Sequence, residues 1–209
     1  MSQLYFEFLN KNQKEIFESL TIFRKEAALA GGTALCLQIG HRYSFDFDLF
    51  FERELKRKDI LKLKKVIQIK EITFNTKEQI NIITNNDIRI TLLFYPFKAV
   101  FKKVETPFLP LFSVKDIALD KSYTIGQRAV WRDYVDLFFL LKKGYITISK
   151  ILKLAPEKFN FEFSERLFLE QLVYFKDLEI IKISFAHESV SSNEIKNFFI
   201  TEVKNRMQS

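Results

Sequence analysis

One segment of the chain constrains its fold more than any other, because its side chains alternate strictly in polarity. Between Tyr43 and Phe51, positions 45, 47, 49 and 51 are apolar, whereas Asp46 and Asp48 stand on the even positions. A period of two is that of a half-buried β-strand. Residues two apart on a strand project from the same face, with α-carbons about 6.5 Å apart. We therefore expect Asp46 and Asp48 to converge on one cation site.

Paired carboxylates of this kind are hard oxygen ligands. They suit Mg²⁺ (or Mn²⁺), since magnesium typically takes one or two carboxylates and completes its shell with substrate phosphates and water. Such a metal neutralises charge and aligns a nucleophile. A solvated strand face produces the same Asp-x-Asp pattern, so the pattern taken alone leaves both interpretations open.

A glycine pair, Gly31-Gly32, stands upstream of this strand, and thirteen residues separate Gly32 from Asp46. Residues 27–30 form a short apolar segment, residues 33–39 suit a short helix, and Gly40 can end that helix in a left-handed conformation. At such a turn, backbone N–H groups can approach a triphosphate without obstruction, and the helix N-terminus adds a favourable potential. A glycine pair alone usually indicates only a turn.

The remaining pattern predicts an α/β (α+β) fold, with one mixed sheet followed by a helical half. Helical spacing appears at residues 10–25, with Asn10 as a cap, and at 57–65; strand patterns appear at 66–74, 80–84 and 88–95, with a hairpin turn at 85–87. Further helices are expected from Ser113, at 131–142, and at 149–154, 164–175 and 193–206. We place the boundary near residue 110, between an α/β domain (1–110) and a helical domain (111–209).

Composition narrows the functional classes. The net charge of +7 favours encounter with polyanions such as nucleotides and RNA. Cys36 is the single cysteine and cannot form an internal disulfide, and no apolar run approaches the roughly 20 residues that cross a bilayer. No signal-peptide pattern opens the chain. We expect a cytoplasmic protein without a membrane role. Neither zinc-ligand spacing nor a G-x-x-x-x-G-K-[ST] phosphate loop is present.

Taken together, the glycine pair and the acidic strand resemble a known signature. The run Ala30-Gly31-Gly32, thirteen residues, then Asp46-Phe47-Asp48-Leu49 is similar to the apolar-Gly-[Gly/Ser] and Asp-apolar-Asp-apolar motifs of the polymerase-beta-like nucleotidyltransferase superfamily. More narrowly, GGTALCLQIGHRYSFDFDLFF resembles the first motif block of the AbiEii/AbiGii-type abortive-infection toxin nucleotidyltransferases. The later run KDIALDKSYTIGQRAVWRDYVDLFFLLKKG resembles their downstream motifs, so the resemblance covers most of the chain.

The resemblance implies an enzyme that moves a nucleoside monophosphate from a nucleoside triphosphate (NTP) to an RNA acceptor such as a tRNA end. It also implies the toxic member of a toxin-antitoxin pair, with a cognate antitoxin as partner. The implied catalytic residues are Asp46, Asp48, Lys121 and Asp136, of which Asp46 and Asp48 hold the metal. The implied nucleotide-binding residues are Gly31, Gly32, Thr33, Arg42, Ser44, Arg128, Arg132 and Asp133.

Physical roles follow for the residues of the helical domain, which we expect to complete the active site. Lys121 could supply a compact positive charge to the triphosphate, and Arg128 could grip phosphate oxygens in a fork. Asp136, one turn beyond Asp133, could orient Lys121 or polarise the acceptor. Alternatively, Arg132 and Asp136 could form an ordinary i,i+4 surface pair.

One departure from the superfamily pattern leaves the chemistry open. Members commonly carry a third carboxylate on a central strand, where it binds metal and deprotonates the attacking hydroxyl. Here DIRITLLFYPF occupies that strand, with Arg89, Thr91 and Leu93 on one face and Asp87 at its outer end. The general base is therefore not evident, and two-metal catalysis is in doubt. A non-catalytic nucleotide- or RNA-binding protein and a γ-phosphoryl transferase on the same scaffold remain alternatives.

Overall fold

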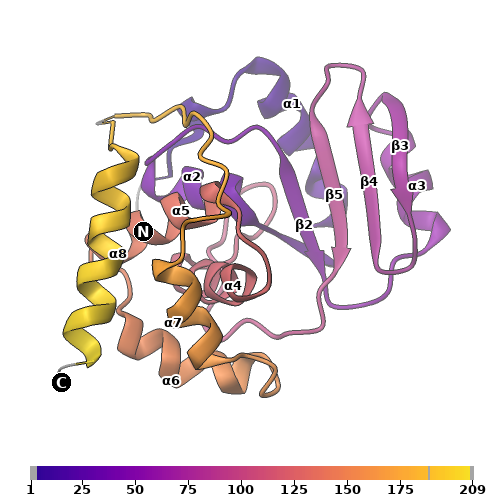
Figure 1. Ribbon diagram of the computed structural model, residues 1–209. Helices are drawn as coiled ribbons and strands as arrows, with labels where there is room; N and C mark the ends of the chain where they lie inside the picture. Colours follow the sequence, from indigo (N-terminus) through magenta and orange to yellow (C-terminus); the bar gives the residue numbers. More distant parts are fainter. Residues whose placement is uncertain (1–3, 188, 208–209) are drawn as a thin grey trace. The chain divides into compact units, whose positions relative to one another are not determined.

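A five-stranded mixed sheet organises the first half of the chain in the computed structural model, which describes residues 4–187 and 189–207 (Figure 1). The strands are β1 (Ala27–Ala30), β2 (Phe47–Phe51), β3 (Ile69–Asn75), β4 (Gln79–Thr84) and β5 (Arg89–Phe94), in the spatial order β1-β2-β5-β4-β3. Only β2 and β5 pair in parallel, and the other neighbours are antiparallel. This is the mixed sheet that the sequence predicts.

The chain divides into two compact units, and each is described by itself. Unit 1 runs to Ser113 and contains the whole sheet, whereas unit 2 begins at Val114 and is helical. Besides the strands, unit 1 contains the helices α1 (Lys11–Ser19), α2 (Gly31–Ile39) and α3 (Arg57–Lys64), and the short 3₁₀ helices η1 (Phe6–Phe8) and η2 (Leu20–Phe23).

Helix α1 begins where the sequence predicts and ends earlier. Asn10 caps it, since its side chain accepts a hydrogen bond from the backbone N–H of Gln13 at 2.9 Å while Gln13 caps in return. After Ser19 the chain tightens into the 3₁₀ turn η2, which places Leu20 and Phe23 in the core. The expected helix over 10–25 is therefore two pieces.

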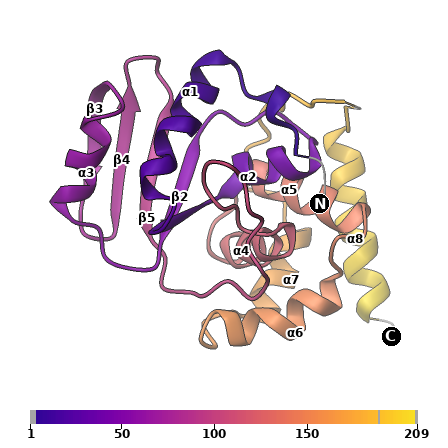
Figure 2. The same ribbon diagram turned by 180° about the vertical axis from the view of Figure 1, so that it is seen from behind.

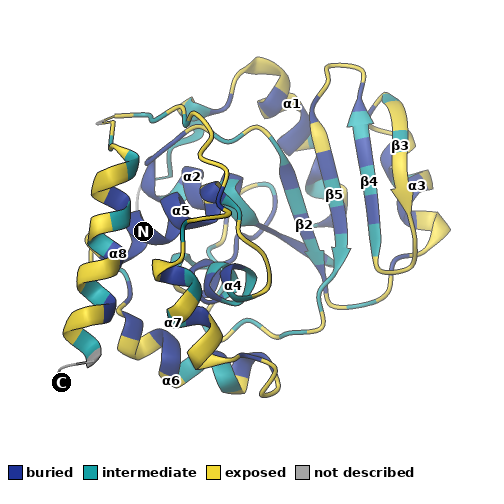
Figure 3. Cartoon of the chain, in the orientation of Figure 1, coloured by how far each residue is buried: buried dark blue, intermediate teal, exposed yellow. Residues whose placement is uncertain are grey.

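One face of the sheet is covered by helices of unit 1. Figure 2 shows α1 and α3 in front of the strands in the reverse view. The side chains of β2 that point to this face are Phe47, Leu49 and Phe51, all fully buried, and Phe47 stacks on Phe17 of α1 at 5.9 Å between ring centroids. The opposite side chains of β2, beginning with Asp48, are only half-buried (Figure 3). The alternation of apolar and polar residues thus has the predicted physical cause.

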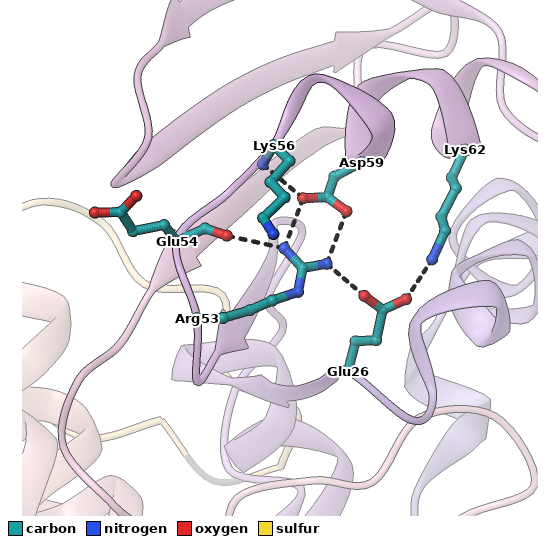
Figure 4. A network of polar contacts seen from close by, with 6 residues as sticks. All are labelled: Glu26, Arg53, Glu54, Lys56, Asp59 and Lys62. Carbon is teal, nitrogen blue, oxygen red and sulfur yellow. Dashed lines mark hydrogen bonds and ion pairs between the residues drawn. The ribbon is translucent and has the colours of Figure 1, made fainter.

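An ion-pair network closes the end of β2 that lies away from Asp48 (Figure 4). Arg53 donates two hydrogen bonds, at 2.8 and 2.9 Å, to the fully buried carboxylate of Asp59, and it also contacts Glu26. Lys62 of α3 contacts Glu26 in turn. Hydrogen bonds from Lys62 and Arg53 lower the pKa of Glu26. For Asp59, burial acts to raise the pKa, but the hydrogen bonds from Arg53 and the backbone outweigh it, so its pKa is lowered.

Unit 2 consists of helices, with a long connecting segment between α7 and α8, and it confirms the helical half. Its helices are α4 (Val114–Gln127), α5 (Trp131–Lys142), α6 (Ile148–Lys158), α7 (Glu165–Val173) and α8 (Ser192–Met207). The predicted helix over 131–142 has the observed bounds, and α6 extends four residues beyond its expected end at Leu154. Within the described part of the chain, no helix combines the length and apolar character needed to cross a membrane.

Candidate active site

The acidic strand is shorter than its sequence pattern predicts. Strand β2 begins at Phe47, so Asp48 lies on the strand and Asp46 lies immediately before it. Two side chains hold the preceding segment as a loop: Thr33 donates a hydrogen bond to the backbone carbonyl of Asp46, and Gln13 donates one to that of Ser44 at 3.1 Å. The expected strand over 43–51 is therefore wrong for its first four residues. Both residues are partly exposed.

The glycine turn lies directly against Asp48. Gly31 opens α2 with φ of +66°, a left-handed conformation that side chains rarely adopt. A Cβ atom added to Gly31 would overlap Asp48 Oδ2, so the carboxylate occupies the space that any other residue would fill. Gly31 is thus required both by its backbone and by its neighbour. The structure brings the glycine pair and the acidic strand together at the N-terminus of α2.

Gly32 makes room for a cation at the same helix end. A Cβ atom on Gly32 would lie 2.6 Å from Arg42 Nη2 and 3.1 Å from Ser44 Oγ. Arg42 is buried, with 4% of its surface exposed, and its Nη1 donates to the Tyr43 carbonyl at 3.1 Å. A buried guanidinium beside the N–H groups of a helix N-terminus favours an anion for two independent reasons, charge and hydrogen bonding.

Thr33 ties the loop to the helix. Its hydroxyl lies 3.0 Å from Ser44 Oγ, within hydrogen-bond distance, and it also binds the Asp46 carbonyl. The predicted nucleotide-binding residues Gly31, Gly32, Thr33, Arg42 and Ser44 therefore gather around the start of α2, next to Asp48.

Gln13 is a positioning residue that the sequence analysis missed. It is buried, with 1% of its surface exposed, and it fastens the loop before β2 to α1 through Ser44. The only sequence signal was a glutamine three residues after the helix cap Asn10, which reads as part of a capping box. A capping role explains its backbone contacts but does not predict its reach to residue 44.

The donor set at the start of β2 fits a magnesium ion held by few protein ligands. Asp46 and Asp48 offer carboxylate oxygens, and no group of three or more His, Cys, Asp or Glu side chains with metal-binding geometry occurs among the residues described. Magnesium is commonly bound through one or two carboxylates plus substrate phosphates rather than by an all-protein cage. The neighbouring anion-attracting helix end supplies a place for those phosphates.

The neighbouring strand carries no third acid in register with this pair. Asp48 pairs with Thr91 across the parallel β2–β5 ladder, and Thr91 pairs with Asn81 of β4. Paired residues of neighbouring strands point to the same face, so the row beside Asp48 is Thr91 and then Asn81. Asp87 lies in the β4–β5 turn, where its carboxylate is exposed and contacts Lys70 at 2.6 Å. As expected from the sequence, strand β5 contains no acid, and Asp87 lies outside it.

In unit 2, Lys121 lies between two carboxylates. Its ammonium is 2.5 Å from Asp133 Oδ1 and 3.0 Å from Asp136 Oδ2, and Asp136 is fully buried. Asp133 Oδ2 is buried and has no hydrogen-bond partner within the described structure. Burial and the neighbouring Asp133 raise the pKa of Tyr134 to about 12, so its hydroxyl stays protonated and donates to the Gln171 carbonyl at 2.8 Å.

The two arginines of unit 2 lie differently from Lys121. Arg128 is exposed just past the end of α4, beside a small pocket of about 220 Å³ that Tyr174 and Asp177 also line. Arg132 is exposed on α5, whereas Asp136 is buried against Lys121. Asp136 is therefore not a surface residue, while its i,i+4 pairing with Arg132 stays a prediction.

Solved structures that superpose on this chain show that it has a nucleotidyltransferase-like fold. MenT4, a nucleotidyltransferase toxin (Rv2826c) from Mycobacterium tuberculosis H37Rv, superposes with a TM-score of 0.64 over 92% of this chain and 80% of its own, at 14% identity. A candidate nucleotidyltransferase from Helicobacter pylori superposes with a TM-score of 0.57 over 96% of this chain and 98% of its own, also at 14% identity.

Sequence comparison adds one relative. The chain is 29% identical over 213 aligned residues to the uncharacterized protein aq_aa25 of Aquifex aeolicus (strain VF5), covering 96% of this chain and 98% of that protein. No family model matches the chain. The chain is thus similar in structure to nucleotidyltransferases, one of which is a toxin, while its narrower family is a matter for proposal.

Proposed function

We propose that this protein is a magnesium-dependent nucleotidyltransferase that moves a nucleoside monophosphate from an NTP to an RNA acceptor, with tRNA as the first candidate. One observation carries the proposal: the carboxylate of Asp48 lies against Gly31 at the start of α2, beside the buried guanidinium of Arg42. A metal-binding acid and a phosphate-binding helix end are thereby adjacent, which is the arrangement that a metal–triphosphate substrate needs.

In unit 1, different residues bind the phosphates and the metal. The N–H groups at Gly31 and Gly32, together with Arg42, hold phosphate oxygens, and Thr33 and Ser44 keep the loop in place beside them. Asp46 and Asp48 would hold the metal, which supplies charge neutralisation and alignment for in-line attack on the α-phosphorus. Because the metal is held by few protein ligands, its binding should depend on the presence of the triphosphate.

In unit 2, Lys121 supplies a positive charge for the phosphates, and Asp136 orients Lys121. The 3.0 Å contact between their charged groups supports the second assignment. Asp133 shares Lys121 and would release it when a more highly charged anion competes. The Lys121→Met variant tests this role, since it removes the charge and preserves most of the volume.

We further propose that the protein is a toxin of the AbiEii/AbiGii type with a cognate antitoxin. The structural similarity to MenT4, a nucleotidyltransferase toxin, supports this assignment. Induced expression should arrest growth of a host that lacks the antitoxin, and the Asp46→Ala variant should not. Normal growth with well-expressed, active wild-type protein would refute the toxin role without touching the enzymatic one.

The decisive assay incubates NTPs labelled at the α-phosphate with total RNA and Mg²⁺. Wild type should transfer label to RNA, and Asp46→Ala should lower transfer at least about 100-fold, because a ligand of the charge-neutralising metal is lost. A parallel reaction with γ-label separates nucleotidyl from phosphoryl transfer, since only the latter carries the γ-phosphate to the acceptor. Equal and negligible α-label transfer by both proteins would refute the proposal.

A second candidate follows from the residue beside Asp48. Strand β5 carries Thr91 beside Asp48 and contains no acid, so the chain could bind Mg²⁺ and NTP without turnover and act by occupancy. Calorimetry distinguishes the two candidates. Binding of NTP and Mg²⁺ without label transfer to any RNA supports the binding protein, whereas turnover excludes it.

A further inference from the structure

The positive charge of this chain is concentrated in one short stretch. Residues 53–70 contain eight Lys and Arg and two Asp and Glu, a net charge of 8 − 2 = +6, while the whole chain carries +7. This stretch comprises α3 and the segments on either side of it. Unit 1 therefore has a local cationic surface that its candidate active site does not explain.

Part of this charge is already neutralised within the structure, and part is not. Arg53 and Lys62 belong to the network around Glu26. Lys56, Arg57 and Lys64, by contrast, are exposed and have no ion-pair partner among the described residues. Exposed cations of one sign attract an anionic partner and are screened by salt.

These cations stand around an apolar groove. A pocket of about 540 Å³ lies between α3 and the β3–β4 hairpin. Its apolar lining, called the groove floor below, is aliphatic and consists of Leu55, Ile60, Leu61, Ile72 and Ile80, and Asn75 and Thr76 add uncharged polar groups. Its charged lining is entirely cationic and consists of Lys56, Arg57, Lys64 and Lys77. Leu61 is 50% exposed and adds an accessible apolar side chain to the groove floor.

The chemistry of the lining selects among anionic partners. Single-stranded nucleic acid is bound by cationic grooves with aromatic side chains on which bases stack, and this groove contains no aromatic residue. An aliphatic floor can instead cover the apolar side chains of a peptide, while the cationic rim pairs with its carboxylates. The volume falls within the roughly 300–1,000 Å³ range of ligand pockets.

We propose that this groove docks an acidic segment of a protein partner, with aliphatic side chains on the groove floor and Asp or Glu against the rim. Gln79 at the start of β4 pairs with Leu93, near the end of β5, so the β3–β4 hairpin lies at the end of β5. Because β2 runs parallel to β5, the hairpin lies at the opposite edge of the sheet from the start of β2. The groove is thus separate from Asp46 and Asp48, and the inference does not rest on the proposed enzymatic function.

The test uses two fluorescein-labelled synthetic peptides of sixteen residues. One has Leu at helical spacing among Glu residues, and the other is all Glu. Binding to the full chain is followed by fluorescence anisotropy at low and at physiological salt. We expect the Leu/Glu peptide to bind at least about tenfold more tightly than the all-Glu peptide, because only it can use the groove floor.

Variants locate the binding. Arg57→Glu with Lys64→Glu should weaken the Leu/Glu peptide about tenfold or more, and Leu61→Ser should weaken it several-fold. The matched control, Lys150→Glu with Lys153→Glu, makes the same change in net charge on exposed residues of α6 and should leave affinity within about twofold. Circular dichroism confirms that each variant is folded.

Three results would overturn the inference. The first is equal affinity for both peptides, or no measurable binding of either, which would mean that the groove floor is not used. The second is equal loss of affinity in the α6 control, which would indicate only non-specific charge attraction. The third is tighter binding of a twenty-nucleotide RNA than of the Leu/Glu peptide, with the same dependence on Arg57 and Lys64, which would make the groove a nucleic-acid surface.

Discussion

Acidic side chains stand near both ends of strand β2, in different surroundings. At its end, beyond Phe51, Glu26 and Asp59 are matched by Arg53 and Lys62 in a network that neutralises them within the fold. At its start, the Asp48 carboxylate lies against the backbone of Gly31, in a space kept clear by the lack of a side chain. The same strand therefore ends in a structural ion network and begins in an accessible acidic site.

Structural and functional carboxylates in one fold can be distinguished by what surrounds them. A carboxylate enclosed by hydrogen-bonding cations stabilises the fold, and removing one member of such a pair should lower the free energy of unfolding. A carboxylate beside a glycine turn at a helix N-terminus can contact an external ligand, and its removal should lower the affinity for that ligand. Variants at the two ends should therefore move different observables.

The largest expected effect on stability is at the network end. Replacing Arg53 with Met leaves the fully buried Asp59 without its two-pronged partner. Leaving a buried charge uncompensated should lower the free energy of unfolding by about 3 kcal/mol. Urea denaturation measures this loss, and NTP binding of the folded variant should be unchanged. Lost NTP binding in a folded Arg53→Met protein would mean that the two ends are coupled.

The next largest effect is on activity, at the glycine turn. Gly31→Ala should lower nucleotide transfer about 100-fold, because the new Cβ displaces the Asp48 carboxylate from the metal position. Gly144→Ala is the matched control: Gly144 has a similar φ of +71° but no atom within 4 Å of an added Cβ. Both changes should cost about 1–2 kcal/mol of stability from backbone strain. Equal activity in the two variants would contradict the role of the turn.

A third acid introduced beside Asp48 should increase activity. Thr91→Asp places an acid beside Asp48 on the neighbouring strand. If the lack of a third acid limits proton removal, the transfer rate should rise about tenfold. Asn81→Asp, one strand further from β2, is the control and should leave the rate unchanged. Initial rates with α-labelled NTP and RNA provide the measurement, and a fall in rate with Thr91→Asp alone would show that Thr91 is not the vacant acid position.

The smallest effect is the acid dependence of stability. Glu26 and Asp59 have pKa values lowered below their ordinary 4.5 and 3.8, so their contribution is complete above pH about 4.5 and is lost as pH falls through the lowered values. Between pH 6 and pH 3, the free energy of unfolding of Glu26→Gln should fall by about 1 kcal/mol less than that of wild type. The exposed Glu157→Gln is the control and should leave it unchanged. Urea denaturation curves of wild type and both variants from pH 6 to pH 3, about the range over which carboxylates titrate, measure these differences.

The alternation around Asp46 and Asp48, the glycine pair and the hairpin turn at 85–87 predicted the mixed sheet, because each reflects local physics that tertiary contacts reinforced. The start of β2 was misplaced by four residues. Thr33 holds the Asp46 carbonyl across 13 positions, and Gln13 holds the Ser44 carbonyl across 31 positions. A local sequence period cannot reveal hydrogen bonds over such separations.

The candidate site shows the same division. The types of its residues could be predicted from motif resemblance, whereas their contacts could not. That Arg42 is buried over Gly32, and that Asp136 is enclosed with Lys121, depends on packing between elements distant in sequence. The cationic groove beside α3 was invisible for a related reason, since its floor combines residues of a helix and a hairpin.

The most direct test of the central claim is a crystal structure of the protein with Mg²⁺ and an NTP analogue that cannot be cleaved at the α-phosphate. We predict phosphate oxygens on the N–H groups of Gly31 and Gly32, and one metal ion shared between Asp46, Asp48 and the triphosphate. Nucleotide bound elsewhere, with no metal at these two carboxylates, would contradict the account.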